Sequence, residues 1–244
     1  MAEESSQVSA TSRRLPALYL ACREIAGTDT RPLPLMARLL ETTEKVDAVV
    51  FITTHGAGRV PQLRSSRPAD EFVVELRLLL EGLGHTPTVH QSFDKHLARL
   101  TIQLFARPAP DMVEVRLGSG MTAGQYRRLG ESLCLWRDRH VMLICVDQLL
   151  GKLDPQQYRS PHDSYWRGLL SQWVEERNWE EALSGSALGS TPSFVKTEKA
   201  LVSDNTLCLL HAAFGIGGSR APQRLFGFYL DDNERALSGY CWMD

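Results

Sequence analysis

The chain has 244 residues, and an average of roughly 150 residues per domain predicts one or two domains. Hydrophobic residues make up 43% and charged residues 23%, as in an ordinary globular protein with one large core. A formal net charge of −2 argues against a nucleic-acid binder that relies on bulk positive charge. No apolar run approaches the ~20 residues that span a bilayer. Residues 1–14 lack the apolar stretch of a secretory signal, so we expect a cytoplasmic protein without membrane partners.

The first half of the chain alternates predicted strands and helices. Residues 1–14, rich in Ser, Glu and Ala, predict a disordered arm, which leaves 15–244 as a single domain. The apolar run 15–21 predicts a buried strand, and 34–45 has the apolar spacing of a helix. The β-branched run 46–53 is typical of a parallel strand covered on both faces, and a strong helical pattern follows at 69–83.

The second half repeats this alternation. It predicts a helix at 97–105, a strand at 112–117, a helix at 122–137 and a buried strand at 140–146. A long amphipathic helix is expected at 161–185, a loop at 184–193, and a helix at 203–214 that is N-capped by Ser203 or Asp204. Segments 224–230 and 237–243 predict a hairpin. The pattern indicates a single α/β domain, with a mostly parallel central sheet, helices on both faces and a C-terminal hairpin.

The candidate site follows from this fold class. In parallel α/β sheets, ligands bind beyond the carboxyl ends of the strands. The residues that follow the predicted strands there include Cys22-Arg23-Glu24, His55-Gly56, Gly118-Ser119 and Asp147-Gln148. None of the five cysteines forms a C-x-x-C pair, which argues against a zinc finger or a disulfide framework.

Five segments together resemble the class III extradiol ring-cleavage dioxygenases of the LigB superfamily, in particular the 4,5-DOPA dioxygenase branch. The segments, in chain order, are 15–20, 52–56, 125–144, 202–215 and 237–242. The resemblance implies a divalent metal, usually iron, held by three side chains with positions open for catechol and oxygen. In this chain the first ligand histidine falls on Cys22, the second on His55, and the third ligand on Ala200 or Leu201. The family's catalytic histidine falls near Gly151.

These substitutions predict that the metal site is lost and that no cofactor is needed. If the strand order follows the family, Cys22, Glu24 and His55 surround one pocket. His55 is then the leading acid–base residue, and Cys22 is either a nucleophilic thiolate or a small residue that fills space. Asp147 could orient His55 or accept a proton.

Four further residues are candidates for binding the substrate. The resemblance places the segment with Lys95 and His96 beside the bound phenol, where a lysine could hold a phenolate or carboxylate. Arg23 and Arg59 could pair with an anionic substrate, although surface ion pairs would explain them equally well.

Three hypotheses remain open from the sequence. The first is a metal-free enzyme that performs isomerisation, cyclisation or ring opening on a phenolic, quinone or polyketide-like small molecule. The second is a ring-opening dioxygenase with a rebuilt Fe²⁺ or Zn²⁺ site. The third is a non-catalytic protein that binds a small molecule or a partner protein. A homodimer is compatible with all three.

Overall fold

The computed structural model describes residues 14–22, 46–54, 58–65, 71–105, 110–118, 120–148, 208–218, 220–226 and 236–243. Within these ranges the fold is one α/β domain built on an eight-stranded sheet. The helices predicted at 34–45 and 161–185, the loop at 184–193 and the cap at Ser203 or Asp204 lie outside the described residues. None of the described helices is long and apolar enough to cross a membrane.

The sheet has the strand order β4-β3-β5-β2-β6-β1-β8-β7. Its centre consists of four mutually parallel strands, β5 (Asp111–Arg116), β2 (Ala48–Thr53), β6 (Val141–Gln148) and β1 (Ala17–Cys22). The C-terminal hairpin of β7 (Gln223–Phe226) and β8 (Ala236–Trp242) adds to β1 through antiparallel pairing. The predicted fold class, including the terminal hairpin, is therefore confirmed.

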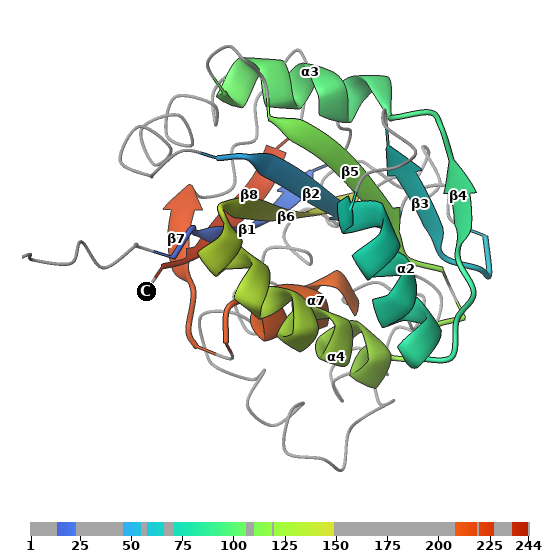
Figure 1. Cartoon of the computed structure of the whole chain (residues 1–244). Coiled ribbons are helices and arrows are strands. Elements are labelled where there is room, and N and C mark those ends of the chain that lie inside the picture. The colour runs from blue at the N-terminus through green and yellow to red at the C-terminus, as the bar shows by residue number, and fades with distance from the viewer. Residues whose placement is uncertain are drawn as a thin grey trace, which may run out of the picture.

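Helices cover both faces of this sheet (Figure 1). On one face lies α3 (Lys95–Leu104), and on the other lie α2 (Glu71–Gly82), α4 (Ala123–Leu133) and α7 (Cys208–Ile216). Successive residues of a strand point to opposite faces, so Val50 and Ile52 of β2 join the core beneath α4 and α7. Phe51 joins the second core beneath α3. A strand buried on both faces explains the continuous apolar sequence of β2.

The sequence pattern does not predict two strands at one side of the sheet, of which β4 is the edge strand. They are β3 (Gln62–Ser65), which is antiparallel to β5, and β4 (Thr88–His90), which is parallel to β3. Both are short, and every residue of β4 is exposed, so neither has the apolar run that marks a buried strand. The helix predicted at 122–137 is an α-helix only to Leu133, after which Cys134–Arg139 form the 3-10 helix η1.

The start of α4 is fixed by its local sequence. Thr122 accepts a hydrogen bond from the backbone N–H of Gln125, and the Gln125 side chain accepts one from the Thr122 N–H, which together form a capping box. The Gln125 side-chain amide also donates to the carbonyl of Leu83 over 2.9 Å, and so ties α4 to the end of α2. These bonds position the loop that leaves the carboxyl end of β5.

Buried Arg137 in η1 connects three distant segments. Its guanidinium donates hydrogen bonds to the carbonyls of Leu15, Ile216 and Trp242. These carbonyls precede β1, end α7 and end β8, respectively. At the same corner Arg14, the last residue of the predicted N-terminal arm, forms an ion pair with Asp138 over 2.7 Å. The chain is therefore anchored to η1 as it enters the sheet.

Candidate functional site

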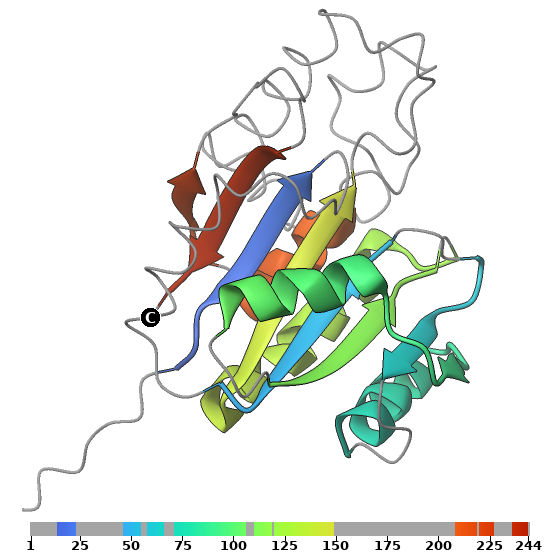
Figure 2. The same cartoon turned by 90° about the horizontal axis from the view of Figure 1, so that it is seen from above.

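The carboxyl ends of three neighbouring strands form the candidate site. Strands β2, β6 and β1 are adjacent and parallel, so Thr53 lies opposite Val146, and Cys22 lies opposite Gln148. In Figure 2, β1 and β6 are seen side by side and point in the same direction. This topology agrees with the expectation that the segments after these strands leave the same edge of the sheet. His55, Arg23 and Glu24, which follow β2 and β1 in the sequence, lie outside the described residues.

Asp147 is the candidate catalytic residue whose side-chain surroundings are described. It is the penultimate residue of β6, lies opposite Ala21 of β1 and is only 1% exposed. The Tyr19 hydroxyl donates a hydrogen bond to Asp147 Oδ2 over 3.1 Å. Burial, together with the charge of this carboxylate, raises the pKa of Tyr19 well above its usual value, so Tyr19 stays a proton donor at neutral pH. Asp147 is thus a buried carboxylate held in a fixed orientation at the edge of the sheet.

The other candidates occupy different positions around this edge. Cys22 is the last residue of β1, while Lys95 is exposed at the first position of α3 and His96 follows it. Arg59 is also exposed, in the segment between β2 and β3. Its backbone carbonyl packs so tightly against Gly118 that a Cβ there would lie 2.3 Å from the Arg59 oxygen. This close approach explains the requirement for glycine two residues after the end of β5.

A second polar cluster lies at the ends of β2 and β5, on the face covered by α3. We call Thr53, Glu114, Arg116 and Asp94 the Glu114 network. Thr53 donates to Glu114 Oε1 over 3.2 Å, and Arg116 Nε donates to the same oxygen. Arg116 Nη2 also donates to Asp94 Oδ2 over 3.0 Å. One buried guanidinium therefore bridges two carboxylates, which fixes the geometry of all four side chains.

The Glu114 network links the end of β2 to the start of α3. Asp94 Oδ1 accepts a hydrogen bond from the Leu97 N–H over 3.4 Å, and the Asp94 carbonyl accepts one from Ala98 over 3.0 Å. Asp94 thereby caps the helix that begins at Lys95. Thr53, at the other end of the network, is two residues before His55. The network thus positions backbone segments that adjoin the predicted acid–base and substrate-binding residues.

Sequence reasoning did not identify Glu114 or Arg116 as site residues. Both lie in a strand whose other face carries Val113 and Val115 in the apolar core. Two charged residues at i and i+2 point to the same side of a strand, so this side of β5 had to bury two charges together. That spacing was a usable signal, because buried charges require partners.

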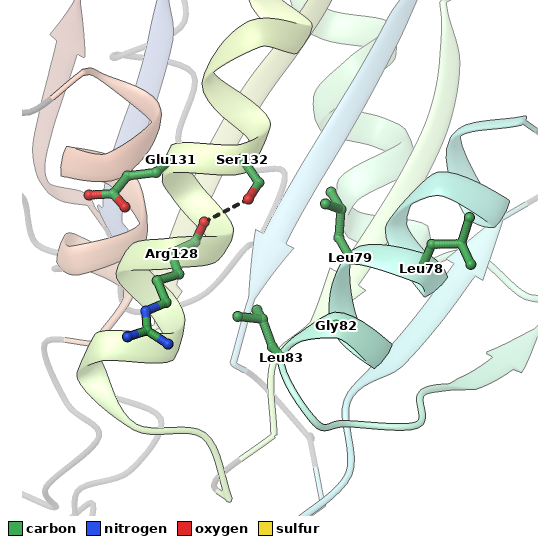
Figure 3. Close-up of a pocket in the computed structure, with 7 residues that line it drawn as sticks. All are labelled: Leu78, Leu79, Gly82, Leu83, Arg128, Glu131 and Ser132. Atoms are coloured by element: carbon green, nitrogen blue, oxygen red, sulfur yellow. Dashed lines mark hydrogen bonds between the residues drawn. The ribbon is translucent and has the colours of Figure 1, made fainter.

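An open groove of about 590 Å³ lies between α2 and α4 (Figure 3). Its walls are formed by Leu78, Leu79, Gly82, Leu83, Arg128, Glu131 and Ser132. The Ser132 hydroxyl donates to the Arg128 carbonyl over 3.0 Å within α4, so this polar group is already satisfied. None of the residues at the carboxyl ends of β2, β6 and β1 lines this groove, which we therefore do not assign to the candidate site.

Within the described residues, the donors at the carboxyl ends of the strands do not form the three-ligand metal centre that the family resemblance implies. Across the described ranges, no three His, Cys, Asp or Glu side chains gather in a metal-binding arrangement. Asp147, the carboxylate at the end of β6, already accepts the Tyr19 hydrogen bond in a buried position. At the sequence positions of the first and third ligands stand Cys22 and Ala200 or Leu201. We therefore derive no chemical step through a metal.

The comparisons with known proteins give information about the fold alone. The structure is similar to a crystal structure of the uncharacterized protein JW3007 from Escherichia coli K12, with a TM-score of 0.63 and 14% sequence identity. The match covers 93% of this chain and 99% of that chain. No protein-family model matches the sequence, and no curated protein matches it. At this identity the structural match shows a shared fold that extends over nearly the whole length of both chains.

Proposed function

We propose that this protein is an enzyme of the extradiol-dioxygenase type of fold that acts by metal-free acid–base chemistry on a phenolic, quinone or polyketide-like small molecule. The observation that carries the proposal is the adjacency of β2, β6 and β1, with buried Asp147 at their common edge. His55 follows the end of β2 by two residues, and Cys22 ends β1. A site at the carboxyl ends of parallel strands is where this fold class binds ligands.

The proposed chemistry is proton transfer. An imidazole exchanges protons near neutral pH, so His55 serves as the general acid or base. Asp147, oriented by Tyr19, supplies a fixed negative charge at the same edge that stabilises a protonated imidazole. Such a pair moves a proton between the hydroxyl and carbon positions of a phenol or enol and its keto form, which is one step of an isomerisation, a cyclisation or a ring opening, while the ring bond that forms or breaks does so within the substrate.

The test starts from a panel of catechols, phenols and quinones. Each compound is incubated with the purified protein, and its consumption is followed by absorbance and mass spectrometry. For the compound that is consumed, His55→Ala should lower the rate by about 100-fold or more, which is the usual contribution of a general acid or base. His90→Ala is the matched control, because His90 is exposed on the edge strand β4. Parental activity in His55→Ala would show that the acid–base residue lies elsewhere.

Two further measurements separate the alternative functions. Elemental analysis that finds about one tightly held iron or zinc per chain would refute the metal-free mechanism and favour a dioxygenase. Binding without turnover of any compound in the panel would favour a non-catalytic binding protein. Cys22→Ser distinguishes two forms of the proposal, since a covalent mechanism predicts near-total loss of activity and a proton-transfer mechanism predicts a small effect.

A further inference from the structure

Two buried polar atoms at the Glu114 network have no hydrogen-bond partner within the part of the chain that the structure describes. They are Glu114 Oε2 and Arg64 Nε. Arg64 on β3 and Glu114 on β5 lie directly opposite each other in the antiparallel pair, so both side chains leave the same face of the sheet. One atom accepts a hydrogen bond and the other donates one. A hydroxyl group can do both, so one placed between the two atoms would satisfy both of them.

The Glu114 carboxylate cannot turn its second oxygen away from this position. Its first oxygen is held by Thr53 and by Arg116, and the residue is 1% exposed. Buried carboxylate oxygens in native proteins almost always have a partner, because an unsatisfied one destabilises the fold. This oxygen is therefore an acceptor for a group that can donate a hydrogen bond.

Aromatic side chains adjoin this acceptor. Phe51 on β2 lies directly opposite Glu114 and belongs to the core on the α3 face. Phe93, immediately before the network residue Asp94, packs against Phe51 with ring centroids 6.1 Å apart and planes tilted by 59°. Phe93 is only partly buried. Phe51 itself is fully buried, so an aromatic ring that approaches Glu114 from this side would first contact the partly exposed ring of Phe93.

We propose that Glu114 and Arg64 bind the hydroxyl group of an aromatic ligand. The hydroxyl donates to Glu114 Oε2 and accepts from Arg64 Nε, while the ring packs beside Phe51 and Phe93. This inference rests on the proposed function and assigns recognition of the substrate hydroxyl to the α3 face of the sheet, whereas Tyr19 and its partner Asp147 lie on the face covered by α4 and α7. It also gives the Glu114 network a role, because the bonds from Thr53 and Arg116 orient the Glu114 carboxylate that recognises the hydroxyl.

Phenol and anisole are a matched pair of probes. Both carry the aromatic ring, but anisole has a methoxy group and cannot donate a hydrogen bond. Binding is measured from amide chemical-shift changes in ¹⁵N-labelled full-length protein, and we expect the protein to bind phenol more tightly than anisole. The variant Glu114→Gln has nearly the same shape. Its amide oxygen can keep the bonds to Thr53 and Arg116, which places its NH₂ group where Oε2 was. At the position of Oε2 the variant thus has a donor in place of an acceptor. The affinity for phenol should therefore fall about 10-fold or more, as expected for the loss of a hydrogen bond to a charged group.

Two variants complete the experiment. Arg64→Met should also weaken phenol binding, and it carries the test if Glu114→Gln does not fold, because Arg64 is only partly buried in an edge region of the sheet. Glu81→Gln changes a surface glutamate that pairs with Arg77 on α2, and it should leave the affinity for phenol unchanged. Anisole binding should be the same in all these proteins.

The outcomes separate this inference from the proposed function. Equal phenol affinity in the parental, Glu114→Gln and Arg64→Met proteins would mean that only water occupies this position, and would overturn the inference. Failure of the parental protein to bind phenol would overturn it as well. In either case a His55-dependent turnover would still support the proposed function. Conversely, phenol binding that depends on Glu114, without turnover that depends on His55, would uphold the inference and refute the proposed reaction.

Discussion

Replacing Arg137 by Met should destabilise the protein substantially without changing its fold. Arg137 is 1% exposed, and its guanidinium donates to the carbonyls of Leu15, Ile216 and Trp242. Methionine fills similar space but donates no hydrogen bond. The three carbonyls then lose a charged donor in a region that excludes water.

The expected loss can be sized from these bonds. A hydrogen bond that involves a charged group contributes about 1.5–3 kcal/mol, so three of them set an upper range of about 4.5–9 kcal/mol. Part of this loss of stability is offset, because the methionine variant has no charged guanidinium that must be removed from water on folding. We therefore expect the free energy of unfolding to fall by about 3–5 kcal/mol, which most domains survive in the folded state. Arg137→Lys should fall in between, since one ammonium cannot reproduce the planar fork that reaches three carbonyls.

The assay is equilibrium unfolding in urea, followed by circular dichroism and by tryptophan fluorescence. The control is Arg77→Met, which removes an exposed i,i+4 ion pair with Glu81 and should change the free energy by less than about 0.5 kcal/mol. Arg137→Met should shift the urea midpoint with little change in slope. A loss below about 1 kcal/mol for Arg137→Met would refute the role of Arg137 in joining these segments.

Three further predictions concern packing and pH. Gly130→Ala should destabilise the fold by about 1–3 kcal/mol, because the new Cβ would lie 2.1 Å from the Ala212 carbonyl of α7; Gly82→Ala, with no atom within 4 Å, is the control and should unfold at the parental urea concentration. Burial and the nearby Arg127 charge lower the pKa of His211 to about 4. The unfolded chain therefore binds this proton first, and stability should decline by about 3 kcal/mol as pH falls from about 6.5 to about 4. Urea unfolding of His211→Leu over this pH range should show a flatter decline, and an identical pH dependence would contradict the assignment. Val50→Asp should abolish cooperative thermal unfolding, because it buries an unpaired charge at a fully buried position of β2; a soluble variant with a sharp melting transition would count against this role.

The central strands and their helices could be predicted because burial on both faces leaves a local trace. The six residues of β2 are all buried, so the run is apolar throughout and can be recognised without knowledge of its neighbours. The amphipathic spacing of α2 and the capping box of α4 are likewise local. The boundaries of these elements were predicted to within a few residues for the same reason.

Strand β3 and the edge strand β4 could not be predicted in this way. A strand near the edge of a sheet forms because it pairs with a neighbouring strand, and its own composition need not favour a strand. In β4 all three residues are exposed, and Leu63 at the centre of β3 is its only fully apolar buried side chain. The sequences of these two segments therefore predict no strand.

In the candidate site, too, some features are local in the sequence and others depend on the tertiary structure. The sequence alone predicted a buried strand that ends next to Asp147, because a strand and its end are local features, although in the structure Asp147 is the penultimate residue of that strand, β6. Only the tertiary structure decided that Asp147 pairs with Tyr19, and that Glu114 and Arg116 share one buried network with Asp94. Tyr19 and Asp147 are separated by 127 intervening residues, and Arg116 and Asp94 belong to different elements. Which charges neutralise one another in a protein interior depends on the order of the strands and on the face that each helix covers, and no local pattern carries that information.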